Sequence, residues 1–195
     1  MTPKSGVASS QTQALNGTVP IAPTNRPAPL VLPAAKETKI KEITLKIPAS
    51  WTQELPANKL RLAQFKTPTA IGDKHPTELV ISSSPASGGD VDLNLKRWVG
   101  QFSAGGRQVN VTTGECSQGK YHLCDVTGTY ELSSAGGKKE LRHGHRSLSV
   151  LLAAEKKGIY YLRLIGPEKS VSAVAEAFRA SFGADASQEQ EYKLP

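Results

Sequence analysis

The clearest periodic pattern in the chain runs from Asp90 to Phe102. Large apolar side chains recur there at the spacing of one helix face: Val91, Leu95, Trp98, Val99 and Phe102. Such a stripe predicts an amphipathic helix that packs against a core. Asp90 stands directly before the stripe, where its carboxylate can accept the unpaired amide hydrogens of the first turn. The pattern therefore indicates one well-defined helix in the middle of the chain.

Segments with the pattern of β-strands surround this helix. Ile43, Leu45 and Ile47 alternate with polar neighbours, which is typical of a half-buried strand. Further strands are expected at residues 60–66, 78–83, 108–113, 121–132, 145–154 and 159–165. The long strand at 121–132 is expected to bend at Gly128, and residues 133–145 are interpreted as a turn. Because residues 156–158 form a tight turn, the last two strands are predicted to pair as a hairpin.

A second helix is expected after Gly166 and Pro167, because proline is favoured at the first helical position. Its apolar residues share one face, and Gly183 stands where a C-terminal cap belongs. The order of strands and helices favours an α+β fold, in which helices pack on a central antiparallel β-sheet.

The ends of the chain differ from its middle in composition. Residues 1–38 are rich in proline, alanine and threonine, and they have too few large apolar side chains to offset the entropy of ordering, so they are interpreted as a disordered linker. A linker at the start suggests that an upstream signal or anchor is missing from this sequence, and a plain unordered tail is the alternative. Residues 39–184 are assigned to a single domain, and residues 185–195 to a flexible tail.

Charge narrows the range of partners. The chain has 195 residues and a formal net charge of +7. A basic protein favours an acidic protein or an anionic surface as its partner. No apolar run approaches the roughly 20 residues of a membrane-spanning helix. These properties leave the oligomeric state open.

Polar side chains along one flank of the predicted helix form a first candidate site, which we call the polar row: Asn94, Arg97 and Gln101. The simpler interpretation is that they bond loop carbonyls at the rim of the core, because partly buried polar groups generally find partners. The functional interpretation is that they line a cleft for a small ligand or for hydrolysis.

A second candidate site is the basic turn, a set of cationic residues that follow a glycine pair: Lys138, Lys139, Arg142, His143, His145 and Arg146. Its positive charge would grow as the histidines protonate, which favours an acidic partner. On a strand, His143 and His145 would point to the same side, but two imidazoles lack the further ligands of a structural metal site. We therefore expect no metal, and a solvated basic loop is the alternative to partner binding.

The sequence contains two cysteines, Cys116 and Cys124. A hairpin at residues 117–123 would bring their backbones close together, so a disulfide is one expectation and two free thiols are the other. Two cysteines are too few for a disulfide-rich scaffold or for a zinc site of paired cysteines.

Common signatures of nucleotide-binding and hydrolytic enzymes are missing from the sequence, including the phosphate-binding loop, the nucleophile elbow and the zinc-binding helix with two histidines. Residues 136–139 are rich in glycine and lysine, but they lie between strands and do not open a helix. The basic turn lacks interleaved aromatic residues for stacking on bases, so no specific nucleic-acid partner is expected. We expect no catalytic residue and no cofactor.

Three segments resemble uncharacterised bacterial proteins related to the PsbP family. They are the Asn-x-x-Arg-Trp-x-x-Gln spacing from Asn94 to Gln101, residues 47–51, and residues 162–167 with the amphipathic helix that follows. The PsbP family comprises extrinsic subunits of the oxygen-evolving complex, and a nuclear-transport factor that binds the Ran GTPase shares its fold. The resemblance covers about residues 39–183 and implies an α/β/α sandwich with a central antiparallel sheet.

The resemblance also suggests a class of function. Known proteins with this fold bind or assemble with different partners, which implies a non-catalytic binding or assembly module. The bacterial relatives are often exported, sometimes as lipoproteins, so the resemblance favours the cell envelope over the cytoplasm. The alternative is a small-ligand-binding or hydrolytic enzyme with a cleft near the polar row, because fold alone does not determine function.

Overall fold

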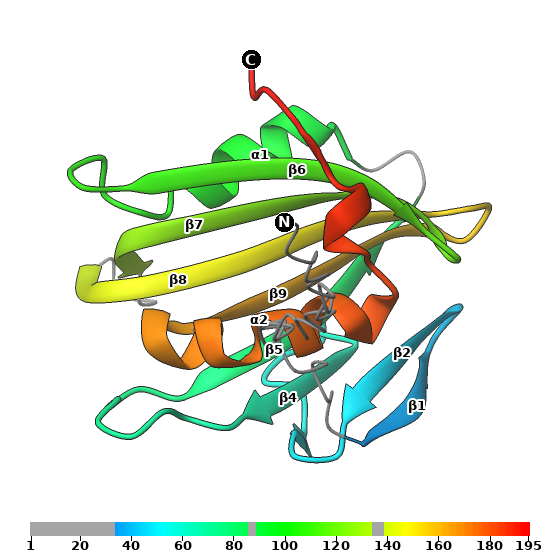
Figure 1. Cartoon of the computed structure of the whole chain (residues 1–195), viewed down its shortest axis with the longest axis horizontal. Helices are drawn as coiled ribbons and strands as arrows, with labels where there is room; N and C mark the ends of the chain where they lie inside the picture. The colour runs from blue at the N-terminus through cyan, green and yellow to red at the C-terminus, as the bar shows by residue number, and fades with distance from the viewer. Residues whose placement is uncertain (1–33, 86–88, 134–138) are drawn as a thin grey trace, which may run out of the picture. The chain divides into compact units, whose positions relative to one another are not determined.

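An eight-stranded antiparallel β-sheet forms the centre of the fold (Figure 1). The structure is a computed structural model and describes residues 34–85, 89–133 and 139–195. Across the sheet the strands follow the order β10 (Gln190–Glu191), β6 (Gln108–Cys116), β7 (Gly119–Ser133), β8 (Lys139–Ala154), β9 (Gly158–Pro167), β5 (Thr77–Ser84), β4 (Ala63–Thr67) and β3 (Thr52–Glu54). The other described elements are a hairpin of β1 (Ala35–Ile40) and β2 (Ile43–Pro48), the helices α1 (Val91–Val99) and α2 (Glu168–Phe182), and the 3-10 turn η1 (Ala186–Gln188).

Helix α2 and the β1–β2 hairpin cover one side of the sheet, which we call the α2 side. In Figure 1, α2 lies across β9 on the near side. Val171 and Phe178 of the helix are fully buried in one apolar cluster with Leu162 of the sheet. The helix begins after Pro167 and ends at Gly183, whose φ of 84° is easily adopted by glycine. The second predicted helix and its C-terminal cap are therefore confirmed, whereas Pro167 is the N-cap residue directly before the helix and not its first helical position.

Helix α1 packs on the opposite side of the sheet, which we call the α1 side. Leu95 and Trp98 of the helix are buried against Val111, Cys124 and Leu151 of β6, β7 and β8. With one helix on each side, the structure confirms the predicted α+β fold, in which a central antiparallel sheet lies between helices.

The first turn of α1 has the predicted cap, because the Asp90 carboxylate accepts a hydrogen bond from the Leu93 amide at 3.0 Å. The helix itself ends at Val99, earlier than the apolar stripe indicates. Phe102 is nevertheless buried, with only 2% of its surface exposed, because the chain after the helix forms an isolated bridge with Tyr130 of β7. The stripe thus predicted burial correctly beyond the end of the helix.

The folded region begins earlier than the predicted boundary at residue 38. Strand β1 covers residues 35–40 and pairs with β2 from Ala35 opposite Pro48 to Ile40 opposite Ile43. Most of its side chains are exposed, so the strand shows no apolar alternation that would distinguish it from a linker. Residues 1–33 lie outside the described residues, and the linker there stays a prediction.

The C-terminal segment, expected to be a flexible tail over residues 185–195, lies along the edge of the sheet. Strand β10 pairs with β6, and the Tyr192 amide then donates to the Val111 carbonyl at 2.8 Å. The Tyr192 hydroxyl reaches Asp92 at 2.7 Å and so connects this segment to α1.

A buried carboxylate explains why so polar a segment is ordered. The Glu189 side chain is only 5% exposed, and it accepts hydrogen bonds from Thr112, Tyr121 and Arg179 at 2.7, 3.2 and 3.2 Å. The two hydroxyl donors come from β6 and β7, and the cation comes from α2. A sequence pattern within the tail therefore cannot reveal these partners. A buried charge with this many donors is satisfied and holds the tail in place.

Strands β7 and β8 form a longer hairpin than predicted. Strand β8 begins at Lys139, inside the region 133–145 that was interpreted as a turn. The pairing register shifts between Gly128 and Tyr130, and Gly128 has a φ of 143°. The predicted irregularity at Gly128 is confirmed, since glycine adopts such a φ without strain.

Candidate functional site

The α1 side of the sheet changes from apolar to polar side chains beyond the part that α1 covers. Residues directly opposite each other on neighbouring strands point to the same side, and one such row runs across Val111, Cys124, Ser149, Arg163 and Val80. Val111 and Cys124 lie in the apolar cluster under the helix, whereas Arg163 and Val80 line a cavity. Along a single row, an apolar core therefore gives way to a polar pocket.

Arg163 of β9 is one of the residues that line this pocket. Its Nε donates to the Ser147 hydroxyl at 3.2 Å, and its guanidinium carbon lies 5.6 Å from the centre of the Tyr130 ring. Its second terminal nitrogen, Nη2, is buried and has no hydrogen-bond partner among the described residues. Burial lowers the pKa of the guanidinium, but arginine remains charged in proteins. Arg163 thus holds a buried positive charge with an unused donor.

His145 of β8 is the second unusual group, with only 3% of its surface exposed. Its Nδ1 lies 3.2 Å from the His143 carbonyl oxygen, whereas its Nε2 is buried without a partner. The ring stacks on Tyr130 at a centroid distance of 6.3 Å and lies 5.7 Å from the His75 ring. Burial lowers the pKa of the imidazole, so the ring is neutral near neutral pH.

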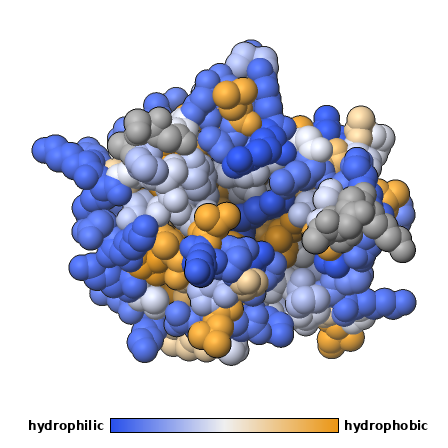
Figure 2. Space-filling model, turned by 180° about the vertical axis from the view of Figure 1, so that it is seen from behind, coloured by the Kyte–Doolittle hydropathy of each residue, from blue (hydrophilic) through white to orange (hydrophobic). Residues whose placement is uncertain are grey.

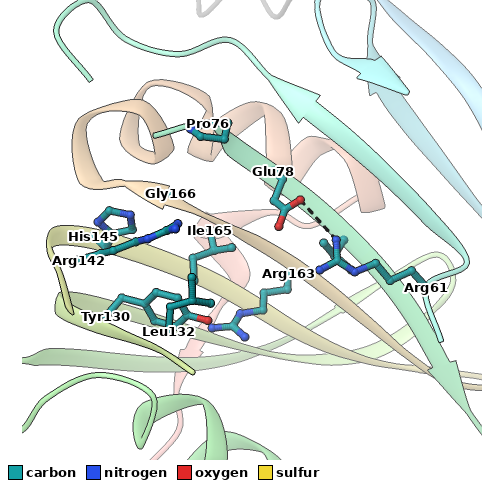
Figure 3. A pocket seen from close by; sticks show the side chains of 11 residues that line it. Arg61, Pro76, Glu78, Tyr130, Leu132, Arg142, His145, Arg163, Ile165 and Gly166 are labelled. Carbon is teal, nitrogen blue, oxygen red and sulfur yellow. Dashed lines mark hydrogen bonds and ion pairs between the residues drawn. The ribbon is translucent and has the colours of Figure 1, made fainter. Parts of the chain in front are cut away.

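These two groups line the same cavity of about 300 Å³ (Figure 3). Arg142 reaches it beside His145, and Arg61 lies at the opposite end, where it pairs with Glu78 at 3.4 Å. The remaining lining is mainly apolar and comes from Pro76, Val80, Tyr130, Leu132, Ile165 and Gly166. Figure 2, which views the molecule from behind, shows hydrophilic residues with separate apolar patches between them.

The charge balance of the pocket is positive. Three arginines line it against one carboxylate, Glu78, which is already bonded by Arg61 and by Gln64 at 3.0 Å. An unpaired buried cation is costly, so a site with unused donors gains most from an acceptor that carries negative charge. The arrangement can bind a compact anion with a small apolar part.

The structure divides the basic turn into separate ion pairs. Lys139 pairs with Glu131 at 2.9 Å, and Arg142 pairs with Glu140 at 3.0 Å. Lys138 lies outside the described residues. Among the described lysines and arginines of the turn, only Lys139 has a largely exposed side chain, at 64%, so this part of the turn is less basic than its sequence indicates.

Arg146 is held on the other side of the sheet. Its guanidinium binds both oxygens of Asp125, at 2.9 and 2.6 Å, and donates to the Ser172 hydroxyl of α2 at 2.8 Å. The Asp125 hydrogen bonds raise its pKa. Such a fork-shaped pair joins the sheet to α2, so Arg146 has a structural role here.

His143 and His145 do not act as a pair of surface imidazoles. Gly144 between them has a φ of 61°, which breaks the alternation of the strand. His143 is exposed, with its Nδ1 at 3.0 Å from the Thr129 hydroxyl, whereas His145 is buried. His145 therefore lies outside the exposed basic surface in which the sequence placed both histidines.

The polar row is largely bonded within its own helix. Asn94 donates to the Asp90 carbonyl at 2.9 Å, and exposed Arg97 donates to the Asn94 side chain at 2.7 Å. The Gln101 side-chain oxygen is buried without a partner among the described residues. None of the three lines the Arg163 pocket, so this candidate pocket is separate from the polar row.

The two cysteines are free thiols. The turn lies at Ser117 and Gln118, so Cys116 is opposite Gly119, whereas Cys124 is opposite Val111. Cys116 packs against the α2-side cluster and Cys124 lies in the α1-side cluster, which places them on opposite faces of the sheet. A disulfide between them is therefore excluded. Burial raises the pKa of the Cys124 thiol to about 12, so it behaves as an apolar core residue.

The sequence did carry a signal for the actual pocket. Arg163 interrupts the apolar run of residues 159–165, where alternation assigns it to the opposite face from Leu162 and Leu164. A cation at such a strand position marks a face that a helix does not fully cover.

Within the described ranges, no group of three or more His, Cys, Asp or Glu side chains could hold a metal ion. None of the helices that the structure describes is both long and apolar enough to cross a membrane.

No protein-family model matches the chain, and no curated protein matches its sequence. Among solved structures, it is similar to the cyanobacterial PsbP (CyanoP) of Synechocystis sp. PCC 6803, with a TM-score of 0.46, 13% identity and coverage of 88% of this chain and 100% of that one. It is also similar to PA94 of Pseudomonas aeruginosa, a protein of unknown function with a suggested regulatory role. That match has a TM-score of 0.43, 17% identity and coverage of 75% of this chain and 92% of the other.

The chain is thus structurally similar to a PsbP protein over most of its length, as the sequence resemblance predicted. Similarities with TM-scores of 0.43 and 0.46 carry no conclusion about function, ligand or partner. Any function must be argued from the pocket itself.

Proposed function

We propose that this protein is a non-catalytic binding module whose Arg163 pocket recognises a compact anion. The observation that supports this most strongly is the buried Nη2 of Arg163, which has no partner among the described residues. A native fold rarely leaves a buried donor on a cation unused, because the group then bears its full desolvation cost. An anion in the pocket would relieve that cost.

The shape and lining of the pocket set limits on the anion. A cavity of about 300 Å³ has room for a sulfate-sized group or for a carboxylate on a small ring. Tyr130, Leu132 and Ile165 would contact an apolar part, while Arg163 and Arg142 would bind the charge. Sulfate and benzoate are therefore suitable probes, because the first tests charge alone and the second tests charge with an apolar ring.

Calorimetric titration with sulfate at constant ionic strength tests the proposal. Charge-assisted hydrogen bonds contribute roughly 1.5–3 kcal/mol each, so we expect Arg163→Gln to weaken sulfate binding about tenfold or more. The matched control is Lys46→Gln, which removes one charge from an exposed position on β2 and should leave the affinity unchanged within about twofold. Equal affinity in wild type and Arg163→Gln, or no binding in wild type, would overturn the proposal.

The finer expectations from the sequence become proposals of their own. The enzyme alternative placed a cleft near the polar row, but Asn94 and Arg97 are hydrogen-bonded within the first turns of α1 and its cap, so we favour binding without catalysis. The partner of the basic turn would meet mainly Lys139, its most exposed described cation. Location in the bacterial cell envelope is supported by the resemblance to bacterial proteins that are often exported and by the linker-like composition of residues 1–38, and fractionation of cells that express the native gene would test it.

A further inference from the structure

The His145 ring has a fixed tautomer. Its Nδ1 lies 3.2 Å from the His143 carbonyl oxygen. A carbonyl oxygen can only accept a hydrogen bond, so Nδ1 must carry a proton. In the neutral ring, Nε2 is then an unprotonated acceptor, and this is the buried nitrogen that has no partner among the described residues.

This tautomer has a consequence for the pocket that His145 lines. Anion oxygens are acceptors too, so a neutral ring opposes them with a lone pair at Nε2. Once protonated, the ring is a donor at both nitrogens. The same side chain therefore disfavours an anion in its neutral form and favours it in its charged form.

We propose that the pocket binds its anion together with one proton, which His145 Nε2 takes up and donates to the ligand. This inference rests on the proposed anion binding, and it adds that binding is regulated by pH. No bond other than that of the proton to Nε2 changes: the proton comes from solvent and returns to it when the anion leaves.

The groups that face the ring support this coupling. His75 and Asp73 lie on the loop before β5, Arg142 and Glu140 on β8, and Tyr130 on β7. Burial, together with the charges of His75 and Arg142, lowers the pKa of His145, and the hydrogen bond to the His143 carbonyl and the charge of Asp73 only partly oppose this. A bound anion would add a negative charge close to Nε2, which raises the pKa in the complex. Between the two pKa values, binding must take up a proton.

The test is sulfate titration between pH 5.5 and 8.5 at constant ionic strength. Sulfate keeps its charge over this range, so any change in affinity reports protons on the protein. We expect the Kd to rise about tenfold per pH unit between the two pKa values of His145. Titration in buffers with different ionisation enthalpies should give an uptake of about one proton per sulfate. Binding with a Kd that does not change with pH would overturn this inference, whereas no binding at any pH would overturn the proposed function.

Variants assign the proton to one histidine. His145→Gln keeps a polar side chain that does not titrate, so the dependence of the Kd on pH should disappear. His143→Gln removes the exposed neighbour and should keep the full dependence, as should His75→Gln to within about twofold. Loss of the dependence in His75→Gln alone would assign the proton to His75 and overturn the role of His145.

A second measurement covers the case in which His145→Gln does not fold. The chain has four histidines, whose ring signals can be followed by NMR in the wild-type protein with and without sulfate. Substitution of the other three histidines, one at a time, assigns their signals, so the signal that remains in all three variants belongs to His145. The pKa of that signal should rise with sulfate. If all four pKa values stay the same, the proton coupling is wrong.

Discussion

The two sides of the β-sheet are built from the same strands but bury different kinds of side chain. On the α2 side, Leu148, Leu162 and Phe178 belong to one continuous apolar cluster. On the α1 side, the apolar cluster under α1 ends along the sheet, and Arg163 and His145 continue it with buried polar atoms. The α2 side is organised for stability, whereas the part of the α1 side beyond the helix retains donors that the fold itself does not use.

The largest effect should come from the α2 side. We expect Phe178→Ala to lower the free energy of unfolding by about 3–5 kcal/mol, because a fully buried aromatic ring is replaced by a cavity. Urea unfolding measures this change. Leu141→Ala is the control, since its side chain is 53% exposed and its loss should cost less than about 0.5 kcal/mol. Similar costs for the two variants would mean that the α2 side is not the stabilising core.

At the pocket we expect a smaller effect on the free energy of unfolding, together with a loss of sulfate affinity. Arg163→Met replaces a buried charge with a shorter, unbranched apolar side chain. Since buried charges often contribute nothing net to stability, the free energy of unfolding should stay within about 1 kcal/mol of wild type or rise. Sulfate binding should be lost in the same variant. A destabilisation comparable with that of Phe178→Ala would show that Arg163 is a structural residue and would remove the contrast between the two sides.

The smallest effect is expected at the basic turn. Lys139→Gln breaks an exposed pair with Glu131, so the free energy of unfolding should change by no more than about 0.5 kcal/mol. The thermal midpoint at low and at high salt measures it. A larger change would indicate that the described part of the basic turn contributes to the fold beyond its ion pair.

Local pattern was sufficient to predict most of the elements. The stripe around Trp98, the alternation after Ile43 and the C-terminal signal at Gly183 each act within one segment, and the structure confirms all three. Strand β1 was missed because its exposed residues show no alternation. The α+β class followed from the order of elements, since antiparallel hairpins pair neighbours in sequence.

The site could not be predicted in the same way, because its properties arise from pairing between distant residues. Arg146 was assigned to a basic surface, but Asp125 of another strand binds it. His145 was assigned to the same surface, although the turn of the chain at Gly144 and the packing of Tyr130 bury it. The sequence left the pairing of Cys116 and Cys124 open, because the position of the turn, at Ser117 and Gln118, decides which face each cysteine takes.

The edges of the sheet have a consequence for how the protein behaves in a crowded solution. Long unpaired edge strands recruit other chains and start aggregation. Here one edge ends in β3, with three residues, and the other in β10, with two, beyond the nine residues of β6. Strand β10 covers part of the β6 edge, and the contacts of Glu189 and Tyr192 hold it there. Shortening the chain before Glu189 would uncover the edge of β6 and create a template on which a second copy can add a strand.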